Sequence, residues 1–229
     1  MTIMQEKDFL RCVPIFQQLN DHDLNRLAQS LKNQSLKKGE VLFHKGSEGD
    51  TLYIIRQGKI KISLISPPCD EVVLAIFSEC DFFGEMTLLD GMPRSADATA
   101  IEPTDLLVLG RQDFLTFLMH NDKVVQATLK SLSQRLRRTD DLLEDTCFLQ
   151  ISARFAKRLV ELSEMHGRQR DGKVFIDLGL TQKDLASVVG TTRESINKEL
   201  RILREKGLVS IQENSIIIHN LERLRRRAH

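Results

Sequence analysis

The chain has 229 residues, 41% of them hydrophobic and 28% charged, an ordinary balance for a globular protein with room for two compact domains. No stretch of 18 or more apolar residues occurs, which excludes a membrane-spanning helix by the usual criterion. Met1–Arg11 carries acidic residues and lacks an apolar core, so we expect no secretory signal, no membrane partner and a cytoplasmic location.

The four cysteines, Cys12, Cys69, Cys80 and Cys147, are widely spaced, and none belongs to a C-x-x-C pair. Zinc and iron–sulfur sites need closely spaced ligands, so we expect no bound metal. In a cytoplasmic protein the thiols should then be reduced.

The net charge of +1 conceals an uneven distribution. From Phe148 to His229 there are 16 Lys and Arg against 10 Asp and Glu, whereas the preceding part of the chain is acidic. A basic C-terminal third suggests a polyanionic partner for that part alone.

The N-terminal half begins helical and then becomes rich in β-forming residues. Leucines at helical spacing predict helix within residues 8–33. Lys59–Leu64 alternates polar and apolar residues, as a strand with one wet face does, and Gln57-Gly58 before it suits a tight turn. Short runs rich in β-forming residues recur through this region, and together they predict an antiparallel roll or sandwich. The runs are Val41–Phe43, Thr51–Ile55, Lys59–Leu64, Val72–Phe77 and Leu106–Leu109.

Arg111–Thr146 returns to helical periodicity and contains no Gly or Pro, so we expect one long helix. Alternating steps of four and three residues within it define a coiled-coil seam, made of Val125, Leu129, Leu132, Leu136, Thr139, Leu143 and Thr146. The seam predicts a homodimer. The other interpretation is a helix packed on its own domain, but the charged residues leave only a narrow apolar stripe.

After Cys147 the pattern changes to that of a winged helix-turn-helix module. We expect a helix, a polar loop, a short strand, two helices and a hairpin, over Ser152–Met165, Gly167–Gly172, Val174–Leu178, Leu185–Val189, a second helix from about Arg193, Val209–Gln212 and Ile216–His219. Glu213-Asn214-Ser215 would form the turn of the hairpin. The fold class is therefore α+β.

The two helices of this module carry clear boundary signals. Thr181 and Asp184 form a capping box, and Gly190 can end the first helix in a left-handed conformation. Thr191 with Glu194 three residues later offers a second cap. Helices joined by so short a turn cross steeply, as in DNA-binding helix-turn-helix motifs.

Polar residues on these helices suit DNA. Arg and Glu read guanine and cytosine edges, so bases should be contacted by Arg193, Glu194, Asn197 and Lys198. Flanking phosphates would be bound by Thr181, Lys183 and Thr192. The alternative for Arg193 and Glu194 is a salt-bridged surface pair.

Thr181–Leu208, with Gly-Thr-Thr-Arg-Glu-Ser-Ile-Asn-Lys at its centre, resembles the DNA-binding helices of the cAMP receptor protein (CRP–FNR) family. The resemblance implies that Arg193, Glu194 and Lys198 contact bases in palindromic, TGTGA-type sites. Relatives commonly have Arg at the position of Lys198, and Lys lacks the planar fork of Arg.

Phe83–Leu89 followed by Pro93–Ala96 is similar to the phosphate-binding cassette of the same family. Glycine permits close backbone approach, and arginine with a neighbouring serine supplies donors for a cyclic phosphate. The glutamate that follows the glycine would accept a hydrogen bond from a ribose 2′-OH. The implied ligand site comprises Gly84, Glu85, Met86, Arg94, Ser95, Ala96, Arg135, Thr139 and Asp140. The alternative is an Arg94–Glu85 salt bridge that closes an empty roll.

The resemblance extends from about Phe16 to the C-terminus and implies the architecture as a unit. It implies a cyclic-nucleotide-binding domain over 1–120, a dimerisation helix over 121–147 and a winged helix-turn-helix domain over 148–229. Thr139 would contact the adenine of cAMP in the same subunit, and Asp140 would contact it from the other, where relatives more often have Ser or Asn.

We therefore expect an allosteric transcription regulator that responds to cAMP and is not an enzyme. We also expect it to bind RNA polymerase. A basic cluster of Arg135, Arg137 and Arg138 leaves cyclic di-GMP open as the ligand, and a ligand-independent regulator is also open. A cyclic-nucleotide phosphodiesterase is the alternative from another class, but no metal-ligand spacing or nearby His base supports it.

Overall fold

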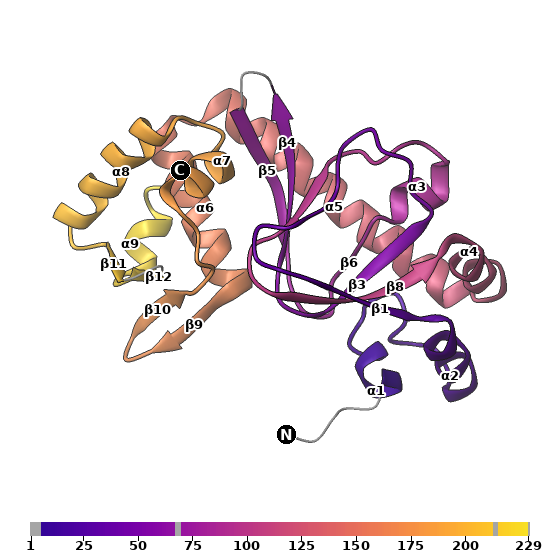
Figure 1. Cartoon of the computed structure of the whole chain (residues 1–229). Helices are drawn as coiled ribbons and strands as arrows, with labels where there is room; N and C mark the ends of the chain where they lie inside the picture. The colour runs from indigo at the N-terminus through magenta and orange to yellow at the C-terminus, as the bar shows by residue number, and fades with distance from the viewer. Residues whose placement is uncertain (1–5, 67–69, 213–214, 229) are drawn as a thin grey trace. The chain divides into compact units, whose positions relative to one another are not determined.

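The computed structural model describes residues 6–66, 70–212 and 215–228, and the chain forms two compact units (Figure 1). The first comprises the chain up to Leu64 together with Ala75–Arg138. The second comprises Ile65–Leu74 and the chain from Thr139 onward. Among the described residues, no helix is long and apolar enough to cross a membrane. In the same part of the chain, no three His, Cys, Asp or Glu residues gather where they could hold a metal ion.

The N-terminal helical segment is divided into two helices, α1 (Glu6–Leu10) and α2 (Asp21–Ser30). Pro14 lies between them, and proline both lacks an N–H and disfavours helix at the residue before it. Leu31 is extended, and the chain continues as β1 (Lys32–Leu36). The prediction of helix up to residue 33 was therefore wrong at its end.

The β-rich region forms two four-stranded sheets, as the predicted antiparallel roll requires. Their strand orders are β1-β8-β3-β6 and β2-β7-β4-β5. The strands span β2 (Val41–Phe43), β3 (Thr51–Gln57), β4 (Ile60–Ser66), β5 (Asp70–Phe77), β6 (Phe82–Phe83), β7 (Asp97–Ala100) and β8 (Thr104–Gly110). In the first sheet Lys32 is paired with Val108, and Tyr53 with both Val108 and Phe83. The short strands β1, β6 and β7 were not predicted.

Two apolar clusters hold the first unit together. One fills the space between the sheets, where Tyr53 and Phe77 both stack on Phe83, with ring centroids 5.4 and 6.0 Å apart. The other packs helices against the sheet that contains β3, through fully buried Phe16, Leu24 and other residues. The sheet that carries the cassette is therefore packed on both faces.

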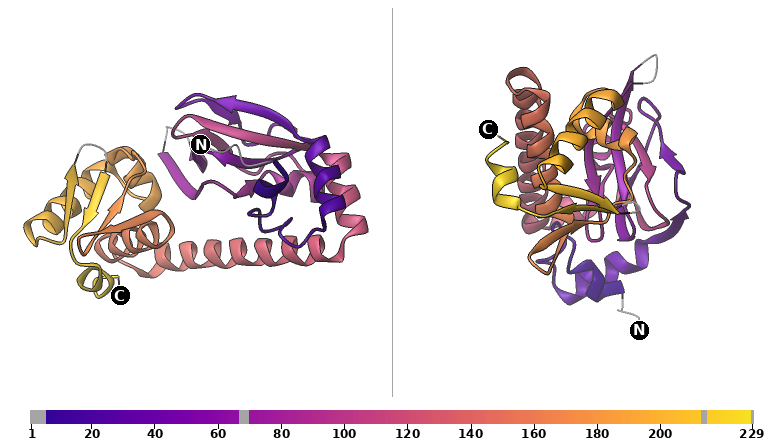
Figure 2. Two further views of the ribbon diagram at one scale, coloured as in Figure 1. Left: turned by 90° about the horizontal axis from the view of Figure 1, so that it is seen from below. Right: turned by 90° about the vertical axis from the view of Figure 1, so that its left-hand side faces the viewer.

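The long predicted helix is broken once, between α4 (Arg111–His120) and α5 (Asp122–Phe148) (Figure 2). Asn121 between them is extended. Its side-chain amide donates to the Phe117 carbonyl at 3.3 Å, and its own carbonyl accepts from Val124 N–H at 3.0 Å. Asn is a strong capping residue, so a break arises here without Gly or Pro.

Helix α5 has one buried and one exposed side. Val124 and Thr128 are buried near its start. Leucines of the predicted seam are exposed instead, with Leu129, Leu136 and Leu143 retaining 59%, 63% and 64% of their accessible surface. An apolar stripe this exposed in a single chain is suited to a partner surface.

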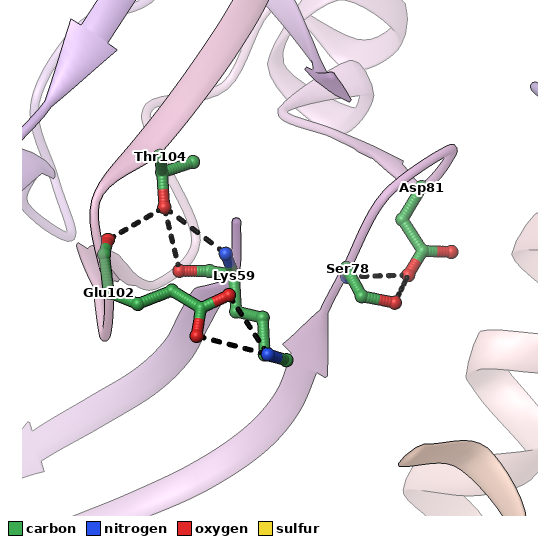
Figure 3. A network of polar contacts seen from close by, with 5 residues as sticks. All are labelled: Lys59, Ser78, Asp81, Glu102 and Thr104. Atoms are coloured by element: carbon green, nitrogen blue, oxygen red, sulfur yellow. Dashed lines mark hydrogen bonds and ion pairs between the residues drawn. The ribbon is translucent and has the colours of Figure 1, made fainter. Parts of the chain in front are cut away.

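A polar network fixes the tight turn between β3 and β4 (Figure 3). Thr104 Oγ1 accepts from Lys59 N at 3.1 Å, and Lys59 Nζ lies 2.9 Å from Glu102 Oε1. Gly58 in this turn has a φ of 96°, and a Cβ there would lie 2.5 Å from the Pro103 carbonyl oxygen. The predicted turn at Gln57-Gly58 therefore needs its glycine.

The second unit is a winged helix-turn-helix module. Its helices are α6 (Ile151–His166), α7 (Gln182–Val189), α8 (Arg193–Glu205) and α9 (Leu221–Arg225). Its sheet has the order β11-β12-β10-β9, with β9 (Gly167–Arg170), β10 (Lys173–Ile176), β11 (Val209–Gln212) and β12 (Ser215–Ile218). Glu213-Asn214 of the predicted hairpin turn lie outside the described residues.

The segment expected to be a polar loop, Gly167–Gly172, is mostly strand. β9 pairs with β10 through a two-residue turn in which Asp171 and Gly172 have φ of 51° and 71°. Asp-Gly is a typical sequence for a turn with two positive φ angles. The prediction was wrong because that signal was not applied.

A disulfide joins Cys12 and Cys80. The expectation of reduced thiols is therefore wrong for this pair, since the fold brings together residues that are 68 positions apart. Cys147 is free and exposed, and Cys69 lies outside the described residues.

Candidate functional site

Arg94 is the most constrained side chain of the cassette. It is 4% exposed, and its Nη1 and Nη2 donate to the carbonyls of Gly84 and Thr51, both at 2.9 Å. Its guanidinium also lies over the Phe43 ring, 4.4 Å from the centroid, a favourable cation–π geometry. Burial lowers the pKa of the Arg94 guanidinium, although arginine stays protonated in proteins. This is a buried cation held mainly by neutral groups.

Two glycines make room for that guanidinium. A Cβ at Gly49 would lie 2.3 Å from Arg94 Nε, and one at Gly84 would lie 2.6 Å from Arg94 Nη1. Gly84 also has a φ of 83° and is the N-cap of α3 (Glu85–Asp90). Neither position can carry a side chain unless Arg94 moves. Gly49 and Thr51 were not among the predicted site residues.

Glu85 is paired with Arg135. The carboxylate is 2% exposed, and its Oε1 accepts from Arg135 Nη1 at 2.6 Å. Arg135 Nη2 also donates to the Phe82 carbonyl, and the guanidinium lies over the Phe77 and Phe82 rings. The Arg94–Glu85 salt bridge considered from the sequence is therefore replaced by a bridge from α5.

Unsatisfied polar atoms remain in this group. Glu85 Oε2 and Arg94 Nε are buried and have no hydrogen-bond partner among the described residues. Burying a polar atom without a partner costs about 1–3 kcal/mol, and more for a charged group. The cassette therefore contains one hydrogen-bond acceptor, Glu85 Oε2, and one donor, Arg94 Nε, that a ligand could satisfy.

The remaining predicted ligand residues differ in burial. Ser95 Oγ lies 3.7 Å from Met86 Sδ, Met86 is 47% exposed, and Ala96 is buried. Thr139 and Asp140 are exposed on α5, within the second unit. The described contacts thus bring together Gly84, Glu85, Arg94 and Arg135, and pair Met86 with Ser95. Thr139 and Asp140 follow Arg135 along α5.

The helix-turn-helix is built as its capping signals predict, with one difference. Thr181 and Asp184 form the capping box of α7, and Gly190 ends that helix with a φ of 67°. The N-cap of α8 is Thr192, whose Oγ1 accepts from Ser195 N at 3.3 Å, so the predicted cap at Thr191 was one residue early. The Thr181 hydroxyl is engaged by Asp184 Oδ2 at 2.6 Å.

Helix α8 separates a buried face from an exposed polar one. Ile196, Leu200 and Leu203 are buried. Arg193, Glu194, Asn197 and Lys198 are exposed, and their spacing places them on one side of the helix. No ion pair engages Arg193 or Glu194 within the described part of the chain, so the salt-bridged surface pair is not formed.

A groove of about 480 Å³ lies beside this face. It is lined by the start of α7, by Arg193 of α8 and by the wing, through Leu180, Thr181, Gln182, Lys183, Leu185, Arg193, Ile211 and Ile216. Lys183, Thr192 and Thr181 are all exposed. The N-termini of two helices and two cations, Lys183 and Arg193, therefore share one surface, which favours phosphate binding.

The comparisons with known proteins agree with this geometry. Residues 33–121 match the model of the cyclic nucleotide-binding domain, and residues 153–227 match that of the Crp-like helix-turn-helix domain. The chain is 33% identical over 214 residues to the CRP-like cAMP-activated global transcriptional regulator of Mycobacterium tuberculosis, with 93% of this chain and 96% of the relative covered.

Solved structures show the same fold. A CRP/FNR-family transcriptional regulator from Thermus thermophilus has a TM-score of 0.72 at 25% identity, with 86% of this chain and 98% of that chain covered. The c-di-GMP-responsive global regulator CLP of Xanthomonas campestris has a TM-score of 0.77 at 20% identity, with 88% and 100% covered. The chain belongs to the CRP–FNR family and is a cyclic-nucleotide-binding, DNA-binding transcription regulator rather than an enzyme.

Proposed function

We propose that this protein is a homodimeric regulator whose DNA binding responds to cAMP. The observation that carries the proposal is a pair of buried cassette atoms that have no hydrogen-bond partner among the described residues, Glu85 Oε2 and Arg94 Nε. A cyclic nucleotide offers a ribose hydroxyl to the first and an anionic phosphate to the second. Binding would satisfy both groups, which a closed, empty roll leaves unsatisfied.

Each cassette residue then has a role. Arg94 binds the cyclic phosphate together with the Ser95 hydroxyl. Gly84, Met86 and Ala96 provide backbone close to the ligand. Glu85 accepts from the ribose 2′-OH while Arg135 holds the carboxylate in place.

The adenine would be contacted from α5. Thr139 would contact it in the same subunit, and Asp140 of the other subunit would accept from the N6 amino group. Support comes from sequence position, since Thr139 follows Arg135 by four residues, about one helical turn. In this proposal residues 1–120 bind the nucleotide, residues 121–147 form the dimer and residues 148–229 bind DNA.

The DNA would be a palindrome with TGTGA-type half-sites, because a symmetric dimer presents two α8 helices. Arg193, Glu194, Asn197 and Lys198 would read bases, while Lys183, Thr192 and the start of α7 at Thr181 would bind phosphates. RNA polymerase would be a further partner at promoters. A protein that acts on the bacterial chromosome works in the cytoplasm.

Calorimetric titration with cAMP, cGMP and cyclic di-GMP tests the ligand assignment. We expect cAMP to bind and Arg94→Leu to abolish binding, because the variant removes the cassette cation that would bind the phosphate. Arg56→Leu, a substitution of a surface arginine on β3, is the matched control and should bind as the original protein does. Preferential binding of cyclic di-GMP would replace cAMP by that ligand, and unchanged affinity in Arg94→Leu would contradict the proposed site.

A further inference from the structure

The disulfide lies at the edge of the first unit's helical core. The Cα atoms of Cys12 and Cys80 are 5.5 Å apart. Both residues pack against the apolar cluster beneath α1 and α2 and are only partly buried. Cys12 follows α1, and Cys80 lies in the turn that connects β5 to β6. The bond therefore ties the N-terminal helices to that turn.

The turn itself has a specific conformation (Figure 3). Asp81 Oδ2 accepts from Ser78 N at 2.8 Å, and Asp81 N donates to the Ser78 carbonyl at 3.0 Å. Cys80 N donates to the Ile55 carbonyl at 3.0 Å, and Ile55 N donates to the Asp81 carbonyl at 2.9 Å. Cys80 has a φ of 69°, a left-handed conformation that is unfavourable for a residue with a Cβ. The hydrogen bonds of the turn and the disulfide therefore act on the same residue.

This turn leads directly into the nucleotide cassette. Phe82 lies two residues after Cys80, and its carbonyl accepts a hydrogen bond from Arg135 Nη2. Arg135 in turn holds Glu85, the acceptor proposed for the ribose. A change in the backbone at Cys80 would therefore move β6 and the Arg135–Glu85 pair together.

We propose that Cys12 and Cys80 form a reversible redox site that sets nucleotide affinity. The inference rests on the proposed function. In the oxidised protein the turn holds β6 and Glu85 as described. In the reduced protein Cys80 is free to leave the left-handed region, the turn relaxes, and the cassette binds nucleotide more weakly.

The chemistry is thiol–disulfide exchange with a dithiol reductant or a disulfide oxidant. A thiolate of the reductant attacks one sulfur of the Cys12–Cys80 bond and forms a mixed disulfide. The second thiolate of the reductant then displaces the remaining cysteine, so two electrons and two protons pass to the protein and the reductant leaves as a disulfide. Oxidation by a low-molecular-weight disulfide is the reverse reaction.

The test uses the full chain with Cys69→Ser and Cys147→Ser, which leaves only the proposed pair. Oxidised and reduced samples are verified by thiol alkylation and mass spectrometry, and both are titrated with cAMP. Because allosteric coupling is typically 5- to 150-fold, we expect reduction to weaken cAMP binding at least about fivefold. Adding Cys12→Ser should give the weaker affinity in either buffer, with near-UV circular dichroism showing that the variant is folded.

Linkage supplies a second readout. By reciprocity, saturating cAMP should raise the ratio of oxidised to reduced protein in a thiol buffer by the same factor by which oxidation tightens cAMP binding. Equal cAMP affinity in both states would contradict the redox site and leave the proposed function intact. A bond that opens only when the protein unfolds would also contradict it. Absence of cyclic-nucleotide binding in either state would contradict the proposed function, and the redox site with it.

Discussion

At the scale of single residues, the cassette shows how one cation determines the types of its neighbours. Arg94 occupies space that a Cβ at Gly49 or Gly84 would fill, so a side chain at either position would displace the guanidinium. Desolvation lowers the pKa of this guanidinium, and an anion beside it would oppose that effect. The residue types around Arg94 thus follow from the space and the hydrogen-bond acceptors that a buried guanidinium needs.

Exposed residues of α7 and α8 predict two distinguishable mutant phenotypes. Glu194→Ala should relax preference at one base pair of each half-site, at a cost of about 1–3 kcal/mol, because a base-reading acceptor is lost. Lys183→Ala should weaken binding to all sequences alike and flatten the salt dependence, because a phosphate contact is lost. Binding measured on a panel of single-base variants at several salt concentrations separates them. A uniform loss from both substitutions would show that α8 does not lie in the major groove.

Sequence could propose Gly84, Glu85 and Arg94 as candidate ligand residues because the cassette motif is contiguous. It did not identify Gly49, Thr51 or Phe43, which surround Arg94 from segments far earlier in the chain. Those neighbours depend on which strands lie together, and pairings such as that of Tyr53 with Phe83 are not visible in local patterns. The disulfide was missed for the same reason, since nothing between Cys12 and Cys80 indicates that their segments meet.

At the scale of elements, local signals placed the strands and helices where apolar periodicity or capping was strong, although many boundaries differ by a few residues. The span of β11 and the capping box of α7 were confirmed. The break at Asn121 was missed because only Gly and Pro were treated as helix breakers. It arises instead from side-chain and backbone capping, which competes with the helix at a single Asn.

Helix α5 is the element that should make the dimer. Replacing both Leu132 and Leu136 by Asp should yield monomers, because like charges would face each other across the seam. Sedimentation velocity measures the outcome. The matched control places Asp at Lys130 and Gln134, exposed positions of the same helix that lie off the seam, and should remain dimeric. Dimers in the Leu132/Leu136 variant would exclude α5 as the interface.

At the scale of the whole molecule, α5 carries contacts to both functional modules. Arg135 binds Glu85 of the cassette. Ten residues later, buried Asp145 binds Lys157 and Arg158 of α6 at 2.7 and 3.1 Å. Arg154 of α6 donates to the Gly190 carbonyl in the helix-turn-helix turn at 3.3 Å. Residues of α5 thus make polar contacts within each unit, and whether these contacts couple the two units is a separate, measurable quantity.

The central claim is that nucleotide and DNA binding are coupled, and reciprocity makes that claim directly measurable. The experiment is the dissociation constant of cAMP for the dimer, determined with and without a saturating duplex that carries a palindromic TGTGA-type site. We predict that the duplex tightens cAMP binding by the same factor, about 5- to 150-fold, by which cAMP tightens binding of the duplex. Equal cAMP affinity with and without the duplex would contradict the account and leave a regulator that binds DNA regardless of its ligand.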